Sequence, residues 1–162
     1  MKKIFFVLMF FVVIIGCESN ETLKEESNTN DEEIEDKQDE MLESAILSYM
    51  EQMTGKYLMV DTYETGSKEQ QKALDKALTD VNIAVLDIED KYDSNLPVVK
   101  ELNNLAESVS FAINELIAGE YSTKVDNSEK VGTYVGEISR NYLDGELPPS
   151  VKVHTGMESA FD

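Results

Sequence analysis

The chain has 162 residues, with 33 aspartates and glutamates against 14 lysines and arginines, and its formal net charge is −19 at pH 7. Nucleic-acid binding depends on clustered lysine and arginine side chains that neutralise phosphates. The sequence has no such cluster, so its composition excludes nucleic acid as a partner. An anionic membrane surface would repel so acidic a chain, which excludes attachment to membranes by charge alone.

The first residues of the chain have the pattern of a targeting segment. Lys2 and Lys3 precede an unbroken apolar run over residues 4–15. This run is shorter than the roughly 20 residues that a membrane-spanning helix needs, but it has the length of the apolar part of a signal peptide. Gly16 and the only cysteine of the chain, Cys17, follow directly. We therefore interpret this segment as a signal peptide and exclude it from the fold.

Residues 14–17 read IIGC and resemble the lipobox of bacterial lipoproteins. The resemblance covers only the first seventeen residues. It implies that a signal peptide, residues 1–16, is cleaved and that the thiol of Cys17 carries a diacylglyceryl group. Two acyl chains anchor a protein stably to a bilayer, so the expected location is the extracytoplasmic face of the cell membrane. The alternative is an ordinary membrane-anchor helix with an incidental cysteine.

The segment after Cys17 is strongly acidic. Residues 18–40 contain eleven acidic side chains against Lys24 and Lys37. Such a composition cannot bury enough apolar surface to offset the entropy lost on ordering. We therefore predict that residues 17–40 form a disordered acidic tether carrying the lipidated cysteine. The alternative is that these acids bind a metal or a cationic partner.

Apolar residues recur at helical spacing after the tether. The first such pattern predicts a helix over about 38–60, and the second predicts a helix over about 68–92. Ser67 and Gln70 have the S-x-x-Q spacing of a capping box, which marks the start of the second helix.

Two further helices complete the predicted domain. Pro97 suits the first position of the third helix, and Gly119 suits its C-terminal end. The fourth helix is expected from about residue 126 to Gly145. Four amphipathic helices with short connections bury their apolar stripes most simply as an up-down bundle. We therefore predict an all-α fold, with a four-helix up-down bundle over residues 41–145.

The last segment, residues 146–162, contains a pair of prolines. Pro148 and Pro149 oppose helix continuation and favour an extended path. Val151 and Val153 alternate with a lysine, so one face of an extended chain can lie against the bundle. We predict an extended C-terminal tail, and leave open whether it packs on the bundle.

The sequence contains no recognisable catalytic or cofactor motif. His154 is its only histidine, whereas nucleophilic triads and most metal sites require histidine with defined partners. The acidic stretches 87–93 and 126–137 lack the ligand spacing of a calcium-binding loop. We therefore expect no catalytic residue, no metal site, no cofactor and no enzymatic activity.

Gly132 and Gly136 are one helical turn apart in the fourth predicted helix. In a membrane this spacing would indicate helix pairing, but charged residues flank both glycines. The first interpretation is close packing on Ser108 and Ala112 of the third helix. The second is a flexible or partner-docking helix.

The sequence therefore favours a non-enzymatic helical module that is anchored to the membrane and binds an unidentified protein. The candidate contact residues are Gly132, Gly136, Val151, Val153 and His154. Two alternatives remain. One is an exclusion or immunity lipoprotein of the type found in phages and plasmids. The other is a carrier of a small ligand or cation, which would need a bundle cavity with inward-pointing polar groups.

Overall fold

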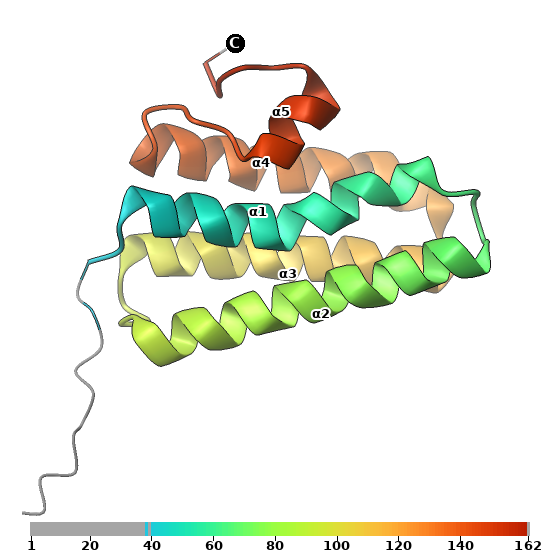
Figure 1. Cartoon of the computed structure of the whole chain (residues 1–162), viewed down its shortest axis with the longest axis horizontal. Coiled ribbons are helices and arrows are strands. Elements are labelled where there is room, and N and C mark those ends of the chain that lie inside the picture. The colour runs from blue at the N-terminus through green and yellow to red at the C-terminus, as the bar shows by residue number, and fades with distance from the viewer. Residues whose placement is uncertain (1–37, 39, 162) are drawn as a thin grey trace, which may run out of the picture. The chain divides into compact units, whose positions relative to one another are not determined.

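Helices account for most of the chain that the structure describes (Figure 1). The structure is a computed structural model, and it describes residue 38 and residues 40–161. The α-helices in this part are α1 (Glu43–Met59), α2 (Lys68–Lys91), α3 (Pro97–Ile117), α4 (Lys124–Tyr142) and α5 (Pro149–Thr155), and the 3-10 helices are η1 (Val60–Thr62) and η2 (Tyr121–Thr123). The described residues contain no strand, which confirms the predicted all-α class. None of these helices is long and apolar enough to cross a membrane.

Several predictions concern residues outside this part of the chain. The signal peptide (1–16), Cys17 and most of the predicted tether (17–40) lie outside the described residues. One residue of the tether, Gln38, makes defined contacts. Its backbone N–H donates to the Lys91 carbonyl oxygen at 2.9 Å, and its own carbonyl accepts from the Asp93 N–H at 3.3 Å.

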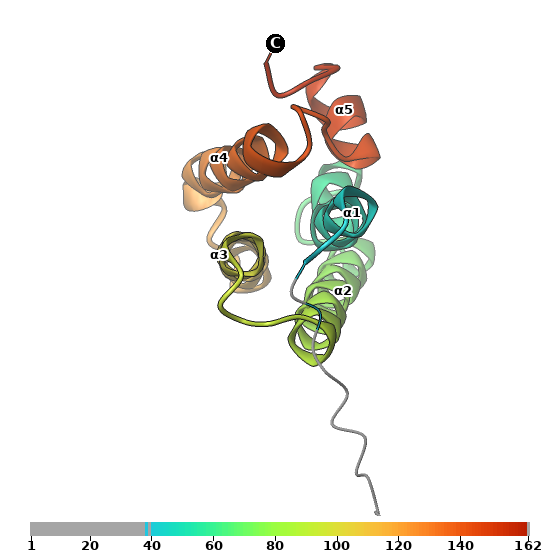
Figure 2. The ribbon, with the colours of Figure 1, turned by 90° about the vertical axis from the view of Figure 1, so that its left-hand side faces the viewer.

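Helix α3 provides the centre of the core. It packs against α1, α2 and α4, and Figure 2 shows this arrangement from one end of the helices. The most deeply buried side chains of α3 recur every three or four residues and thus form one face: Leu102, Leu105, Val109 and Ile113. This stripe is the one that the sequence pattern predicts.

The ends of α2 and α3 follow the predicted capping chemistry. The Ser67 hydroxyl accepts a hydrogen bond from the Gln70 N–H at 3.1 Å, which confirms the N-cap. The reciprocal half of the predicted capping box is not formed. The Gln70 side chain accepts from the Gly66 N–H at 2.7 Å, and the Ser67 N–H donates to the Glu64 carbonyl oxygen at 3.0 Å. Pro97 is the first residue of α3, and Gly119 follows its end with a φ of +83°. Glycine adopts this left-handed conformation at little cost.

Two predicted helix starts differ from the structure. Helix α1 begins at Glu43 because the backbone of Gln38 already pairs with the end of α2 and Leu42 is extended. Helix α4 begins at Lys124, earlier than predicted, because the 3-10 turn of η2 leads directly into it.

The predicted extended C-terminal tail is wrong, since its centre forms helix α5. Pro148 is extended, with a ψ of 145°, but Pro149 is the first residue of α5. A proline is tolerated there because the first N–H groups of a helix have no partner within it. The backbone N–H and the hydroxyl of Ser150 both donate to Glu51 Oε2, at 2.9 and 2.8 Å. With Val151 buried in the core, α5 is docked against α1 (Figure 2).

A tyrosine on α1 links that helix to α2. The Tyr49 hydroxyl donates to Asp87 Oδ2 at 2.6 Å, and Lys91 donates to the same oxygen at 2.9 Å. These two hydrogen bonds lower the pKa of Asp87. Burial, followed by the hydrogen bond to Asp87, raises the pKa of Tyr49. The ring of Tyr49 also packs edge-on against Tyr92, with a centroid distance of 6.3 Å.

Truncating the buried face of α3 is expected to destabilise the protein strongly. Ile113 is fully buried, so Ile113→Ala should lower the free energy of unfolding by about 2–5 kcal/mol. Phe111 on the same helix is 54% exposed, and Phe111→Ala should change it by less than about 0.5 kcal/mol. Urea unfolding of the purified protein measures both values. Equal losses for the two variants would contradict the position of this face.

Replacing Asp87 is expected to make the unfolding free energy of the protein depend less on pH in acid. Because folding lowers its pKa, the ionised carboxylate stabilises the folded state above the ordinary value of 3.8. This contribution is lost as the pH falls through the lower folded-state value. In urea titrations between about pH 4 and 2, Asp87→Asn should therefore show a shallower decline in unfolding free energy than the unaltered protein. Tyr49→Phe, which removes one donor, should show an intermediate decline, and unchanged slopes would refute this role.

Candidate functional site

A cavity lies where α1 and α4 separate. Helix α1 packs mainly against α2, and α4 packs mainly against α3, so α1 and α4 contact each other only slightly. Helix α5 and the chain after it cover the space between them. The cavity has a volume of about 240 Å³, just below the range of about 300–1,000 Å³ that is usual for ligand pockets. Its buried lining is mostly apolar and consists of Thr54, Tyr57, Val131, Val135, Leu147 and Val151. We call this space the α5 cavity.

The two glycines of α4 line the α5 cavity. A Cβ atom built on Gly132 would have no neighbouring heavy atom within 4 Å. A Cβ atom on Gly136 would lie 3.0 Å from Arg140 Nη1, and its three nearest heavy atoms all belong to the Arg140 side chain. The interpretation that these glycines pack closely on Ser108 and Ala112 of α3 is therefore wrong. They instead leave space on the side of α4 that faces the cavity.

Arg140 contributes a positive charge to the wall of the α5 cavity. It is the only arginine in the chain. Its guanidinium lies against Gly136, one turn earlier on α4, where the missing side chain makes room for it. Arg140 Nη1 donates to the carbonyl oxygen of Ala160 at 3.3 Å. A guanidinium has five N–H donors, so this bond uses only a part of its capacity.

The hydroxyl groups around the α5 cavity have partners within the protein. Thr54 Oγ1 donates to the Met50 carbonyl oxygen at 2.7 Å, and Thr155 Oγ1 donates to that of Val151 at 2.8 Å. The hydroxyl oxygens of Tyr57 and Ser128 are 3.3 Å apart. Because these groups are already hydrogen-bonded, the interior presents a mainly apolar surface to any occupant.

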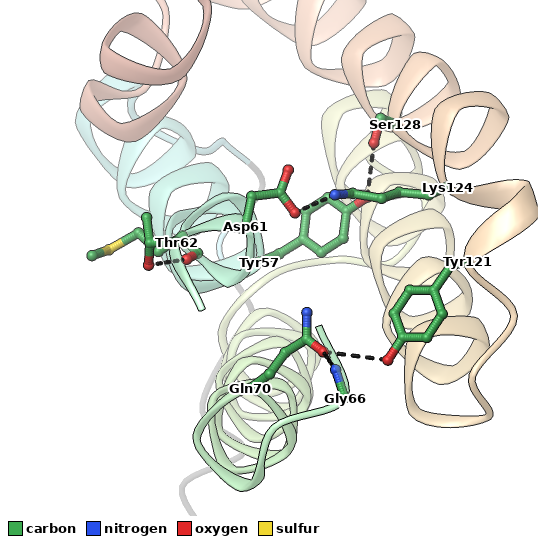
Figure 3. Close-up of polar contacts among 9 residues, drawn as sticks. Tyr57, Asp61, Thr62, Gly66, Gln70, Tyr121, Lys124 and Ser128 are labelled. Carbon is green, nitrogen blue, oxygen red and sulfur yellow. Dashed lines mark hydrogen bonds and ion pairs between the residues drawn. The ribbon is translucent and has the colours of Figure 1, made fainter. Parts of the chain in front are cut away.

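Polar contacts join the end of α1 to the start of α4 beside the α5 cavity (Figure 3). Tyr57 contacts Ser128 at the start of α4, and burial raises the pKa of its hydroxyl. Lys124 forms an ion pair with Asp61 of η1 beside this contact. These interactions tie the C-terminal end of α1 to the N-terminal end of α4, so the wall of the cavity is fixed at this end.

At the same end of the helices, Gln70 connects α2 to η2. Its side-chain oxygen accepts hydrogen bonds from the Gly66 N–H at 2.7 Å and from the Tyr121 hydroxyl at 3.3 Å (Figure 3). The residue that positions the start of α2 therefore also holds the segment leading into α4.

A second hollow lies between α1 and α5, on the outer side of α5. It has a volume of about 580 Å³ and is lined by Glu51, Leu58, Met59, Thr62, Pro149, Ser150, Val153 and His154. Val153 is 87% exposed and Met59 is 57% exposed. Leu58 and His154 also line the α5 cavity, so the two hollows are adjacent. We call this surface the α1–α5 groove.

The structure divides the five candidate residues between these hollows. Gly132, Gly136 and Val151 line the α5 cavity, Val153 lines the α1–α5 groove, and His154 lines both. The five residues therefore lie in one neighbourhood but on two hollows, rather than on a single contact surface.

Arg140 was not identified from the sequence. Its spacing from Gly136 is the signal that was available, because residues four positions apart lie on the same face of a helix. The contact of Tyr57 with Ser128 depends on tertiary packing, so its position in the wall of the cavity is not evident from the sequence.

Within residues 38 and 40–161, no cluster of three or more histidine, cysteine, aspartate or glutamate side chains is placed to hold a metal ion. Comparison with models of protein families, with curated protein sequences and with solved structures finds no match to this chain.

Replacing Gly132 by alanine is expected to stabilise the protein. A glycine inside a helix costs about 0.5–1 kcal/mol relative to alanine, and a Cβ atom at this position meets open space. Gly132→Ala should therefore raise the unfolding free energy by about that amount in urea titrations. Gly136→Ala places a methyl group against Arg140 and should gain less. A loss of stability in Gly132→Ala would restore the close-packing interpretation.

Proposed function

We propose that this chain is a membrane-anchored extracytoplasmic lipoprotein whose helical domain binds another protein without enzymatic chemistry. The observation that carries the proposal is the α1–α5 groove. There, Val153 and Met59 expose 87% and 57% of their surface beside a hollow of about 580 Å³. Exposed apolar side chains around a concave surface are typical of interaction sites.

For the domain itself, we propose a four-helix up-down bundle made by α1 to α4. Figure 1 supports this, because successive helices begin at opposite ends of the molecule. The connections are short, and α3 packs against all three of the other helices. In this arrangement α5 is an addition to the bundle that creates the groove on its surface.

For the membrane anchor, the support comes from the sequence. The lipobox-like residues 14–17 and the acidic stretch 18–40 combine an anchor with a spacer. A diacylglyceryl group on Cys17 would supply two acyl chains, which suffice for stable attachment. The acidic spacer would keep the helical domain away from an anionic lipid surface.

The chemistry of the α1–α5 groove indicates the kind of partner. The residues that line it include one acid, Glu51, and no lysine or arginine. The net charge of the whole chain is −19. A complementary partner segment would place an apolar side chain beside Val153 and Met59, with lysine or arginine on either side. Charge complementarity of this kind accelerates association and selects the partner.

Site-specific photo-crosslinking in the native host tests this proposal. A photoreactive residue at Val153 should give one discrete adduct, and the crosslinked partner peptide should contain lysine or arginine next to an apolar residue. The matched control probe is at Ile83, which is 53% exposed on α2, a helix that does not contact α5. Met59→Lys should abolish the adduct, because it removes an apolar contact and places a positive charge opposite the basic residues of the partner.

The outcomes separate the parts of the proposal. No adduct from Val153, or the same adduct from Ile83, would overturn the assignment of the groove as a binding site. Cys17→Ser removes the lipidated thiol, so the chain that has not been crosslinked should leave the membrane fraction. A Cys17→Ser chain that stays in that fraction without a crosslink would contradict anchoring through Cys17.

A further inference from the structure

We infer that the α5 cavity is a binding site for a small amphiphile, namely a single apolar chain that ends in a carboxylate. This site is distinct from the α1–α5 groove of the proposed function, because it lies on the inner side of α5, against α4. The inference rests on an apolar interior, a single guanidinium in its wall and an exposed rim.

The interior suits an apolar chain. Val131 and Val135 of α4, Leu147 of the following loop and Val151 of α5 are buried and line it. The hydroxyls of Thr54 and Tyr57 face their own hydrogen-bond partners. An apolar chain that enters such a space removes apolar surface from water and leaves no polar group unpaired. The volume of about 240 Å³ limits the occupant to a short chain.

Arg140 selects the group at the end of that chain. A guanidinium donates two parallel hydrogen bonds to a carboxylate, and such bidentate, charge-assisted pairs are among the stronger hydrogen bonds in proteins. The side chain is already positioned, since it lies against Gly136 and donates to the Ala160 carbonyl. The chain as a whole carries a charge of −19 and repels anions. Arg140 is the only lysine or arginine among the residues that line the cavity, so recognition of a carboxylate here depends on it.

The rim of the α5 cavity allows entry from solvent. Gly132, His154 and Met157 line the cavity and are exposed. The absence of a side chain at Gly132 leaves that part of the rim open. A bulky residue at this position would occupy the entrance, which provides a variant that blocks the site without touching Arg140.

Titration with octanoate, followed by methyl NMR of the full chain, tests this inference. Saturable shifts are expected at the methyl groups of Val131, Val135 and Val151. Octan-1-ol serves as the matched probe with the same apolar chain and no charge. Arg140 is exposed to solvent, which screens the ion pair, so Arg140→Gln should weaken octanoate binding by about fivefold. The same variant should change octanol binding by less than about twofold.

Three further variants make the result specific. Arg140→Lys keeps the charge without the planar fork and should bind octanoate with intermediate affinity. Gly132→Leu should abolish the binding of both probes. Val153→Asp alters only the α1–α5 groove and should leave octanoate binding unchanged. The proposal of a protein-binding groove and the proposal of an amphiphile site can therefore fail separately. Thermal unfolding of each variant confirms that it folds.

The inference is overturned if octanoate produces no saturable shift, or if the shifts lie away from the α5 cavity. Equal weakening of octanoate and octanol binding by Arg140→Gln would also overturn it, because the guanidinium would then have no selective role.

Titration with vesicles of phosphatidylglycerol is a separate experiment. Shifts with these vesicles and none with octanoate would show that the site contacts a bilayer lipid, which contradicts a soluble occupant.

Discussion

The incomplete contact between α1 and α4 is the constraint on which the rest of the structure depends. Each of these helices packs well against a neighbour, α2 for α1 and α3 for α4, but they contact each other only slightly. The apolar side chains that face this space need a cover, and α5 supplies it. The inner side of α5 then bounds the cavity, and its outer side bounds the groove.

Glu51 contributes hydrogen bonds that hold this cover in place. Its carboxylate accepts hydrogen bonds from both the backbone N–H and the hydroxyl of Ser150, in the first turn of α5. The first N–H groups of a helix lack partners within the helix and carry a partial positive charge. A carboxylate from α1 therefore caps α5 from outside. This contact compensates for Pro148 at the N-cap position, which offers no side-chain hydrogen bond.

The sequence predicts those parts of the fold that depend on local chemistry. The buried stripe of α3, the cap at Ser67 and the turn at Gly119 follow from spacing and from residue type, and the structure agrees with them. The proline pair misled the prediction for the tail, because Pro149 is equally compatible with an extended chain and with the first position of a helix. Tertiary contacts decide between them, namely the hydrogen bonds from Ser150 to Glu51, 99 residues away in sequence, and the burial of Val151.

The candidate site shows the same limit. Gly132 and Gly136 stand out in the sequence, but which neighbour they face depends on where α5 docks. Their expected partner was α3, whereas the structure places open space and Arg140 beside them. The spacing of Gly136 and Arg140 was readable, yet the Ala160 carbonyl that receives the guanidinium lies twenty residues further along the chain.

Helix α5 has only seven residues, which has an energetic consequence for both hollows. A helix of this length is not stable alone in water, so it forms only while it is docked. Val151 and Val153, two residues apart on the same short element, face different hollows. The inner boundary of the cavity and the wall of the groove therefore exist only together, and a change that undocks α5 removes both hollows at once.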